Sequence, residues 1–406
     1  MRYVFKERGE VSEDGTEELL SVSKYTGVRV RSTTTDREAR AASLVGYKKC
    51  EPNDIVSNIM LAWDSALGVA FDSGIVSSAY EVYVPQQEID PHFLDLLLRT
   101  PEYRVAFTIV SKGIVPSRWR MYTESFNDIQ MILPPLKEQK QIGRFVSRVD
   151  ENISRNIGNL ETQISMLEEK RSAFITQALT KGLNPDVAMK NSGVNGLGRI
   201  PEHWDLSQLR WIKKPGSSIT YGIVQAGPDI EGGIPYIRVS DMSGDVLPQT
   251  GYKRTSEEID DSYSRSRVLP GDLVITIRAS IGKTLIVPEY LTRANLTQGT
   301  AKLSVREDIS NQFVFWALQS QPSLEELWNQ SKGATFKEIT LEVLRKHWIV
   351  LPPFEEQLTI VEYVNKLTQI IDISKKLIQE KIVMLQEYRT SLISAAVIGK
   401  IDVQSL

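Results

Sequence analysis

The sequence predicts an α+β protein in which two similar mixed α/β domains are separated by an antiparallel two-helix coiled coil, the whole forming a pseudo-twofold internal repeat. Two observations predict this fold. Residues 133–182 and 351–399 both begin with Leu-Pro-Pro and then carry an apolar residue at every seventh position. The short apolar runs and turn signals ahead of the first segment return, about 218 residues later, ahead of the second. A pattern that recurs at a fixed offset indicates a duplicated chain.

The two heptad segments predict two long helices that pack on each other. A seven-residue apolar repeat gives each helix a stripe that another helix must cover. At about 1.5 Å per residue, roughly 45 residues give each helix a length of the order of 65 Å, which suits a spacer. The predicted seam residues are Val146, Ile153, Leu160, Leu167 and Phe174 in the first helix and Val364, Ile371, Ile378, Leu385 and Leu392 in the second.

Composition shifts and the two helical patterns divide the chain into five parts. The second globular domain opens with Ile-Pro-Glu-His-Trp at residues 200–204, after a segment rich in Gly and Asn. Such a segment, without periodicity, is typical of a linker. The predicted parts are a first domain at 1–132, a first helix at 133–183, a linker at 184–199, a second domain at 200–350, and a second helix with a C-terminal tail at 351–406.

Within the first domain, short apolar runs bounded by turn signals predict strands, and two helices follow. Several of these features have a counterpart in the second domain. Pro52-Asn53-Asp54 returns as Pro-Gly-Asp at 270–272, and Ser-Lys-Gly at 111–113 returns at 331–333. The residues between these anchors differ, so the domains share a scaffold but not a surface. The predicted strands are at 19–23, 54–59, 69–71, 80–84 and 301–305, and the predicted helices at 91–99 and from 101.

Composition excludes several classes of protein. With a single cysteine, Cys50, the chain has no disulfide framework and no cysteine-rich zinc site, which favours the reducing cytoplasm. The first residues carry no apolar signal-peptide core, and no run of about 18 apolar residues occurs, so we expect a soluble protein without a membrane partner.

Motifs for catalysis are missing from the sequence. The three histidines, His92, His203 and His347, are isolated from one another and form no metal-binding frame. No GxGxxG or GxxxxGK[ST] motif is present, and the two Pro-Pro pairs stand at helix starts rather than in a methyltransferase loop. We therefore predict no catalytic residues, no metal site and no cofactor in this chain.

Two basic stretches stand out in a chain whose net charge is −3. Residues 23–49 hold seven bases against two acids, and residues 262–302 hold six against two. Phosphate contacts from Lys and Arg supply much of the affinity of proteins for DNA. A solvated charged face explains such a stretch about as well.

The duplicated domains, each followed by Leu-Pro-Pro-x-x-Glu-Gln and a heptad helix, resemble the specificity subunit of type I restriction-modification systems. The Ile-Pro-Glu-His-Trp opening and the closing Gly-Lys-Ile-Asp-Val at 399–403 are also similar to that family. The resemblance covers essentially the whole chain. One departure is the first domain, which starts at Met1 without an Ile-Pro-x-x-Trp opening.

The resemblance implies a sequence-specific, non-catalytic DNA-binding subunit. Each globular part would be a target recognition domain that reads one half of a bipartite double-stranded DNA site, and the helix pair would set the spacer. It also implies two methyltransferase (modification) subunits as partners, with restriction subunits in the full complex. S-adenosylmethionine, ATP and Mg²⁺ are expected only in those partners. The alternative is a duplicated coiled-coil adaptor that binds only proteins, which the two basic stretches disfavour.

Arg and Lys commonly read guanine and Asn and Gln read adenine, whereas phosphate contacts only position the protein. Asn295 and Gln298 fit adenine, but a structural polar role is favoured for both. The DNA-binding residues that we predict are basic or flank a basic stretch. They are Lys24, Tyr25, Arg29, Arg31, Arg37, Arg40, Lys112, Arg118 and Arg120 in the first domain, and Arg238, Arg265, Arg267, Arg278, Lys283, Lys332 and Lys337 in the second.

The flanking faces of the two helices are the predicted contact surface for partner subunits, because the seam positions are used by the helix pair itself. The candidates are Arg144, Phe145, Arg148, Gln163 and Arg171 on the first helix and Tyr363, Gln379, Tyr388 and Arg389 on the second.

Overall fold

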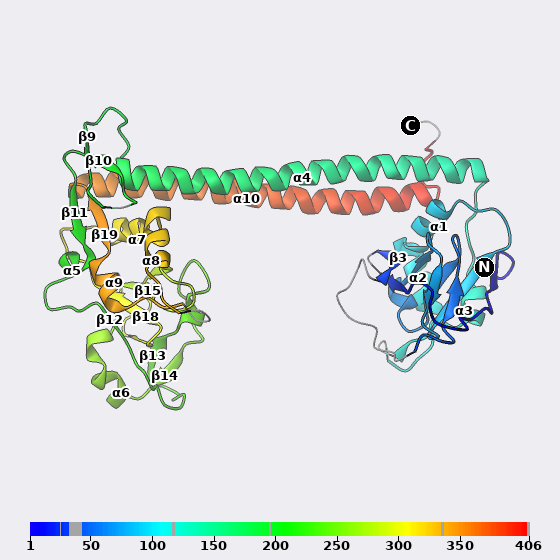
Figure 1. Ribbon diagram of the computed structural model, residues 1–406, viewed down its shortest axis with the longest axis horizontal. Helices are drawn as coiled ribbons and strands as arrows, with labels where there is room; N and C mark the ends of the chain where they lie inside the picture. The colour runs from blue at the N-terminus through cyan, green and yellow to red at the C-terminus, as the bar shows by residue number, and fades with distance from the viewer. Residues whose placement is uncertain (25, 32–42, 116–117, 195, 334–336, 404–406) are drawn as a thin grey trace. The chain divides into compact units, whose positions relative to one another are not determined.

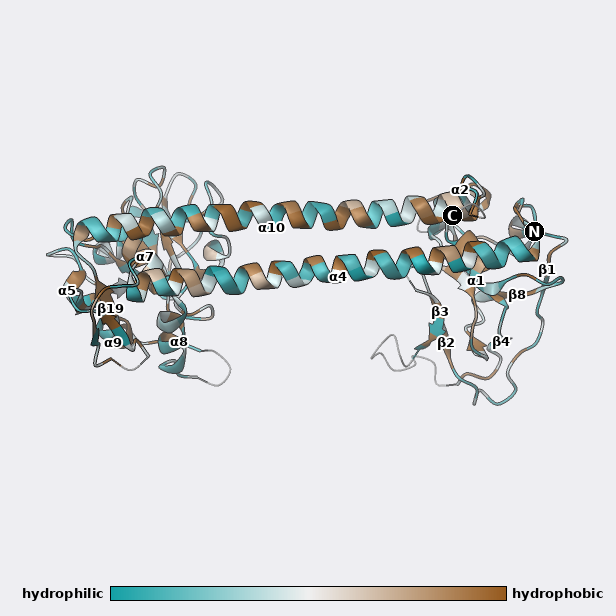
Figure 2. Ribbon diagram, turned by 90° about the horizontal axis from the view of Figure 1, so that it is seen from above, coloured by the Kyte–Doolittle hydropathy of each residue, from teal (hydrophilic) through white to brown (hydrophobic). Residues whose placement is uncertain are grey.

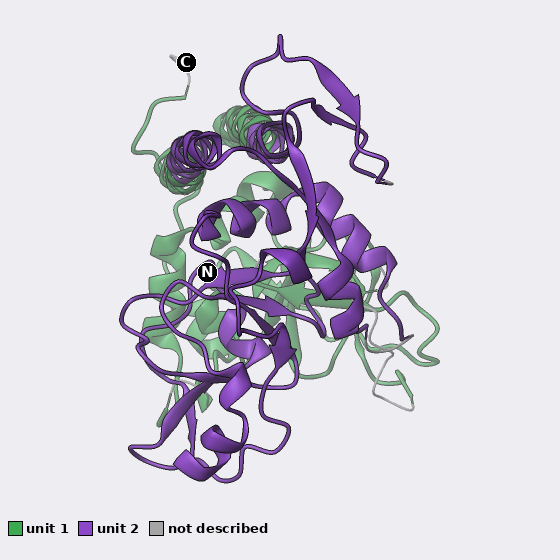
Figure 3. Ribbon diagram, turned by 90° about the vertical axis from the view of Figure 1, so that its left-hand side faces the viewer, with its two compact units in different colours: residues 1–161, 379–406 green, residues 162–378 purple. Residues whose placement is uncertain are grey.

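The structure is a computed structural model that describes residues 1–24, 26–31, 43–115, 118–194, 196–333 and 337–403. The chain divides into two compact units, which Figure 3 shows in different colours. Unit 1 comprises residues 1–161 and 379–406, and unit 2 comprises residues 162–378. Each unit therefore holds one globular part together with a portion of both long helices. This differs from the predicted division, which kept each helix whole.

Unit 1 contains eight strands and three short helices among its described residues, followed by the first part of a long helix (Figure 1). The elements are β1 (Phe5–Glu7), β2 (Leu20–Ser23), β3 (Gly27–Val30), β4 (Lys48–Cys50), β5 (Ile55–Asn58), β6 (Leu67–Val69), β7 (Gly74–Val76), β8 (Tyr80–Pro85), α1 (Pro91–Leu98), α2 (Pro101–Val110), α3 (Thr123–Asn127) and α4 (Leu136–Lys181).

Unit 2 contains the C-terminal part of α4 and the N-terminal part of the second long helix, α10 (Figure 1). Its elements are β9 (Met189–Asn191), β10 (Arg199–Pro201), β11 (Asp205–Gln208), α5 (Leu209–Ile212), β12 (Thr220–Tyr221), β13 (Ile234–Ile237), β14 (Lys253–Thr255), α6 (Glu257–Ser262), β15 (Leu273–Thr276), β16 (Thr284–Ile286), β17 (Asn295–Leu296), β18 (Thr300–Leu303), α7 (Asn311–Gln319), α8 (Gln321–Asn329), α9 (Leu341–Lys346), β19 (Trp348–Leu351) and α10 (Phe354–Val397).

The internal repeat is visible in the sheet topology. The main sheet of unit 1 has the order β1-β8-β5-β6, and that of unit 2 has the order β12-β18-β15-β16. These orders match when β5 is equated with β15 and β8 with β18, as the sequence offset requires. The three short helices that follow each sheet match in order as well. The predicted duplication is therefore a duplication of fold.

The central strand separates two hydrophobic cores in each unit. Side chains alternate between the two faces of a strand. Accordingly, Ile55 of β5 faces one cluster and Val56 faces another. In β15, Leu273 and Ile275 face one cluster while Val274 faces the second. Because both faces are covered, every residue of β5 and β15 is buried.

A repeated tight turn starts each central strand. The backbone is left-handed at Asn53 (φ 78°) and at Gly271 (φ 85°), residue types that tolerate this conformation best. The next residue closes the turn with its side chain. Asp54 Oδ2 accepts from the amide of Glu51 at 2.8 Å, and Asp272 Oδ2 accepts from that of Leu269 at 2.9 Å. The repeated turn predicted from the sequence is thereby confirmed.

The segment predicted as a linker contains structure. Strands β9 and β10 pair in antiparallel register, from Arg199 opposite Asn191 to Pro201 opposite Met189. Three of the glycines that suggested a linker, Gly193, Gly196 and Gly198, lie between the two strands of this hairpin. Periodicity could not reveal it because each strand has only three residues.

The long helices bury five of their ten predicted seam residues. Val146, Ile153, Leu160, Val364 and Ile371 are at most 8% exposed, and Figure 2 shows apolar residues recurring along both helices. The half-buried seam residues are Leu167, Ile378, Leu385 and Leu392.

Phe174 does not fit the predicted seam, because it is 43% exposed while its neighbour Ile175 is buried. A straight helix drifts about 20° per heptad from a strict seven-residue repeat. By the fifth heptad position that drift has moved the buried stripe onto the next residue.

Ion pairs join α4 and α10 inside each unit. In unit 1, Arg389 Nε lies 3.2 Å from Asp150 Oδ1. In unit 2, Lys375 lies 2.5 Å from Glu168, and Arg171 lies 3.8 Å from Asp372. Arg171 and Arg389 occupy equivalent positions of the repeat. Both belong to the contact between the helices, and not to the flanking faces where we had expected them.

Candidate nucleic-acid interface

The Ser-Lys-Gly loops occupy equivalent places in the two units. In unit 1, Lys112 and Arg120 exchange two backbone hydrogen bonds of 2.9 Å and close the loop at its base. In unit 2, Lys332 and Glu338 do the same, again at 2.9 Å.

Each loop base is also tied to the end of its central strand. The amide of Met121 donates to the Ile59 carbonyl, and that of Ile339 donates to the Ile277 carbonyl, each at 3.0 Å. The repeated Ser-Lys-Gly sequence therefore marks two equivalent loops, and each loop is tied to its central strand.

Aromatic side chains support both loops, in different ways. In unit 1, Trp63 and Trp119 pack edge to face with their centroids 5.5 Å apart, and Arg120 donates to the Trp119 carbonyl at 2.8 Å. In unit 2, the ammonium of Lys337 lies 4.6 Å from the centroid of Trp328. A lysine ammonium over an indole face is attracted by the negative potential that the ring quadrupole creates there. Equivalent loops thus present unlike surfaces.

Several predicted DNA-binding residues of these loops face solvent. Lys112 and Arg118 are exposed, as is Ile114, which is 95% exposed beside them. In unit 2, Lys332 is exposed. These side chains have the accessibility that contact with a duplex requires.

Other predicted residues are engaged inside the protein. Arg238 forms a two-pronged ion pair with Asp241, with contacts of 3.0 and 2.7 Å. Arg278 lies 3.0 Å from Glu338, and Lys283 donates to the Ser243 carbonyl at 2.8 Å. An arginine held by two carboxylate bonds is fixed in geometry. We therefore expect Arg238 to shape its loop more than to read bases.

Arg267 belongs to a buried cluster that the sequence did not reveal. Its Nε donates to Asp260 Oδ2 at 2.7 Å, and Arg293 and the amide of Asn295 bind the same carboxylate. Asp260 is fully buried. Burial acts to raise the pKa of Asp260, but the hydrogen bonds from Asn295, Arg293 and Arg267 outweigh it and leave this pKa below its ordinary value. Asn295, weighed above as an adenine reader, has the structural role that was favoured.

Arg265 shares the second basic stretch with Arg267 but lies on the surface. It lies between Asp260 and Arg267 in the chain, within a 3₁₀ turn at Ser264–Ser266. The cluster therefore fixes the backbone that carries this exposed arginine.

The basic stretch of unit 1 is described in part. Lys24 lies 2.7 Å from Asp64, and the guanidinium of Arg29 lies 5.7 Å from the centroid of Phe71. Arg31 is half-buried. Tyr25, Arg37 and Arg40 lie outside the described residues.

A glutamine of the Leu-Pro-Pro-x-x-Glu-Gln motif joins each long helix to its globular part. Gln139 accepts from the amide of Asp90 at 2.8 Å and donates to the Pro134 carbonyl at 2.8 Å. Gln357 accepts from the amide of Ser310 at 2.9 Å and donates to the Pro352 carbonyl at 2.9 Å. Both glutamines are buried.

Asp90 and Ser310 are the N-cap residues of α1 and α7, so the repeated motif fixes the start of each long helix against a domain helix. The sequence showed the repeated Glu-Gln pair but not this partner, which lies about fifty residues earlier in the chain.

The part of the chain that the structure describes holds no group of three or more His, Cys, Asp or Glu residues in position to bind a metal ion. Nor does any described helix combine the length and apolar character needed to cross a membrane.

The fold defines a duplicated protein, in which two copies of one mixed α/β domain are each followed by a long helix. Residues 14–165 and 228–381 each match the sequence model of the type I restriction modification DNA specificity domain. Because these matches cover most of the chain, the protein belongs to this family.

Known relatives agree with this assignment. The chain is 28% identical to the type I restriction enzyme EcoBI specificity subunit of Escherichia coli over 287 residues, which is 70% of this chain and 60% of that subunit. It is also 28% identical over 331 residues to a putative type I restriction enzyme MjaX specificity subunit of Methanocaldococcus jannaschii, covering 79% of this chain and 70% of that one.

Solved structures share the fold. The HsdS subunit from Thermoanaerobacter tengcongensis superposes with a TM-score of 0.60 at 18% identity, covering 99% of this chain and 96% of that one. A chain from a study of the assembly and conformational transition of the type I R-M system gives 0.64 at 17% identity, covering 98% of both chains.

Proposed function

We propose that this chain is the DNA specificity subunit of a type I restriction-modification complex, and that each unit reads one half of a bipartite double-stranded site. One observation carries the proposal. Each of the two matched family domains contains one globular part, and the main sheets of the two parts have the same strand order. Equivalent loops with unlike aromatic supports, Trp63 and Trp119 in unit 1 and Trp328 in unit 2, suit the reading of two unlike half-sites. An adaptor that binds only proteins would not need a domain of the DNA specificity family.

The two long helices are proposed to form an antiparallel coiled coil with pseudo-twofold symmetry that sets the distance between the half-sites. Within unit 2 the ion pairs run in opposite chain order, since Glu168 pairs with Lys375 and Arg171 with Asp372. The buried heptad residues of each unit support the same arrangement. The continuous helices, of 46 and 44 residues, would convert their length into a fixed number of unread base pairs.

The helices also offer surface for modification subunits. Tyr363, Ile370, Leu377 and Met384 of α10 recur at every seventh position and are 40–66% exposed, so they form a second apolar stripe that the seam does not use. A helix of a partner covers such a stripe. At the positions 218 residues earlier, α4 carries Asn152 and Asn159 between its apolar residues. We therefore place the stronger apolar contact on α10.

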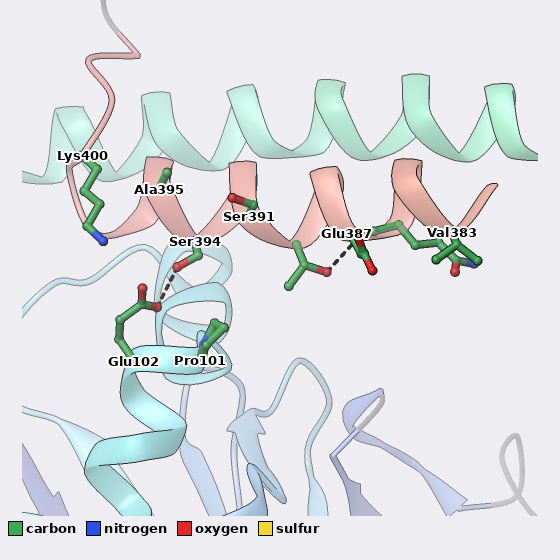
Figure 4. A pocket seen from close by; sticks show the side chains of 10 residues that line it. Pro101, Glu102, Val383, Glu387, Ser391, Ser394, Ala395 and Lys400 are labelled. Carbon is green, nitrogen blue, oxygen red and sulfur yellow. Dashed lines mark hydrogen bonds between the residues drawn. The ribbon is translucent and has the colours of Figure 1, made fainter. Parts of the chain in front are cut away.

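A hollow of about 630 Å³ within unit 1 extends this surface (Figure 4). It lies between the start of α2 and the last turns of α10, where Ser394 donates to Glu102 at 2.6 Å. This bond, with the nearby charge of Lys400, lowers the pKa of Glu102 below its ordinary value. Val383, which is 52% exposed, lines the hollow. An apolar rim beside fixed charges suits a protein partner.

Catalysis is assigned to the partners in this proposal. Methylation would come from two modification subunits and cleavage from restriction subunits, and those chains would hold S-adenosylmethionine, ATP and Mg²⁺. The complex would act in the cytoplasm.

A mobility-shift experiment tests the proposal. The purified chain, with and without its modification subunits, is mixed with a pool of random duplexes, and the retained duplexes are sequenced. We expect enrichment of one motif with two defined halves around an unspecified spacer. Binding without sequence dependence in every mixture would contradict DNA recognition. Binding of S-adenosylmethionine by the purified chain alone would contradict the non-catalytic role.

A further inference from the structure

We propose that Ile114, in the Ser-Lys-Gly loop of unit 1, reads the 5-methyl group of a thymine in the major groove of DNA. The inference rests on the proposed DNA-reading function and adds one base-specific contact to it. Three features of the loop support it, namely its narrow two-stranded base, the exposure of Ile114 and the two cations beside that residue.

The loop has a narrow, two-stranded base. Lys112 and Arg120 exchange backbone hydrogen bonds of 2.9 Å, and the Arg118 amide donates to the Val115 carbonyl at 2.9 Å. The two strands touch at Gly113, because a Cβ built there would lie 2.6 Å from the Arg118 carbonyl oxygen. Paired strands lie about 5 Å apart. The loop is therefore a slender ribbon with the dimensions of a β-hairpin.

The body of unit 1 holds the base of this ribbon in place. The Trp63 carbonyl accepts from the Thr108 hydroxyl of α2 at 3.0 Å, and the Trp63 indole Nε1 donates to the Met60 carbonyl at 3.0 Å. The same indole packs against Trp119 of the ribbon. A side chain on a support that is already fixed loses less conformational freedom when it binds a ligand.

Ile114 is an apolar side chain that the ribbon presents to solvent, with 95% of its surface exposed. Covering an exposed apolar side chain is favourable. Lys112 and Arg118, on either side of it in the chain, are exposed as well, and the described residues give their side chains no hydrogen bond or ion pair. An apolar group between two cations fits DNA, where the base edges lie between two rows of phosphates.

The width of the ribbon selects the major groove. That groove is about 12 Å wide and admits a two-stranded β-ribbon, whereas the minor groove is about 6 Å wide. The apolar group that base edges present in the major groove is the C5-methyl of thymine, and apolar side chains read it by contact. Ile114 therefore recognises a T·A pair in the half-site that unit 1 reads.

The two halves of the repeat differ in sequence at this position. With the offset of 220 that relates the two Ser-Lys-Gly sequences, Ile114 corresponds to Ala334, which lies outside the described residues. Because Ile114 belongs to unit 1 alone, its effect on recognition should be confined to one of the two half-sites.

Replacement of thymine by uracil tests the contact, because uracil lacks only the methyl group. The purified chain, in complex with its modification subunits, is titrated onto duplexes that carry the selected site, with each thymine of either half-site replaced in turn. Loss of one buried methyl group weakens binding about fourfold, and we expect one position in one half-site to show this loss. Ile114→Ala should bind the thymine and uracil duplexes of that position equally, and Ile114→Val should still distinguish them.

Ile109→Ala is the matched control. Ile109 of α2 is also exposed, at 76%, but it precedes the ribbon in the chain. The control complex should keep the full loss of affinity on uracil substitution. Ile114→Ala should also leave the dependence of affinity on salt unchanged, because it removes no charge.

Two results would overturn the contact. One is a wild-type complex that binds uracil as tightly as thymine at every position. The other is an Ile114→Ala complex that distinguishes the two duplexes as the wild type does, which would assign Ile114 to the loop itself or to a protein partner. A random-duplex pool without any preferred site would overturn the proposed function as well, whereas a preferred site without the thymine effect overturns this inference alone.

Discussion

Unit 1 and unit 2 contain the same four-stranded sheet and the same three helices after it, but they stabilise the rest of their structure differently. Unit 2 adds the β9–β10 hairpin, the β11–β19 ladder and the ion cluster around Asp260. Unit 1 has no counterpart to these among its described residues. Its β2–β3 and β4–β7 pairs do have counterparts in unit 2, in the antiparallel pair of β13 and β14 and in the bridge between Val268 and Ala294. The sheet, the turn ahead of the central strand and the glutamine contact therefore form the scaffold that both units share. The additions are where the units acquire their own surfaces.

The largest expected effect comes from removing the Trp204 indole of unit 2, whose Nε1 donates to Glu356 Oε2 at 3.1 Å. Trp204→Ala deletes a fully buried indole and leaves Glu356 without its donor. Truncation of a buried aromatic side chain costs about 4 kcal/mol of the free energy of unfolding. Urea unfolding, followed by hydrogen exchange in peptides of unit 2, measures the loss. Trp211→Ala is the matched control, because this indole is 63% exposed and should cost less than about 1 kcal/mol.

Asp260→Asn breaks the ion cluster of unit 2 and should lower the free energy of unfolding by about 3 kcal/mol. The neutral amide leaves Arg267 and Arg293 without their shared carboxylate. The same unfolding experiment measures this loss. The neighbouring Asp261 is exposed, and Asp261→Asn should cost less than about 1 kcal/mol. Equal losses for the two variants would contradict the role of the buried cluster.

The same cluster predicts a dependence of stability on pH. Because the pKa of Asp260 is lowered in the folded protein, its contribution is complete above the unfolded value of about 3.9. The contribution is lost as the pH falls through the lower folded value. The difference in unfolding free energy between the wild type and Asp260→Asn should therefore shrink below about pH 4. A difference that grows on acidification would contradict the assigned direction.

The glutamine contacts are the same in both units, so equivalent substitutions should have equivalent effects. Gln139→Ala leaves the amide of Asp90 and the carbonyl of Pro134 without partners, and Gln357→Ala does the same at Ser310 and Pro352. Each change should cost about 2 kcal/mol. Hydrogen exchange should show the loss in unit 1 for the first variant and in unit 2 for the second. The control Gln163→Ala is exposed and should have little effect.

The smallest effects concern the loops. Lys112→Ala and Lys332→Ala each remove one exposed charge at equivalent positions. Each should weaken DNA binding by about 1 kcal/mol and reduce the dependence of log affinity on log salt by about one. Salt titrations with the modification subunits present measure both quantities. Substitution of Arg238, which is held by Asp241, should leave the salt dependence less changed. A larger change in salt dependence for the Arg238 substitution than for Lys112→Ala or Lys332→Ala would contradict the assignment of the loops to DNA binding.

The sequence predicted those features that depend on local pattern. Duplication, the heptad helices, the Asn53 and Gly271 turns and the Ser-Lys-Gly loops all follow from neighbouring residues or a fixed offset. The Asp260 cluster and the partners of Gln139 were not predictable, because they join residues that only the fold brings together. For the same reason the basic stretch could not separate Arg267, which is paired internally, from the exposed Arg265. Phe174 shows the limit of the heptad rule, since helix drift changes which residue is buried.

We propose that the two long helices set the distance between the two DNA half-sites that the units read. The units divide at residues 161 and 162 of α4 and at residues 378 and 379 of α10. One whole heptad is therefore inserted after Leu160 and another after Ile378, and methylation is mapped across the genome of cells that carry the full system. Seven residues add about 10 Å of helix, so the spacer should lengthen by at most about three base pairs while both half-sites stay the same. Altered half-sites with an unchanged spacer would contradict the claim.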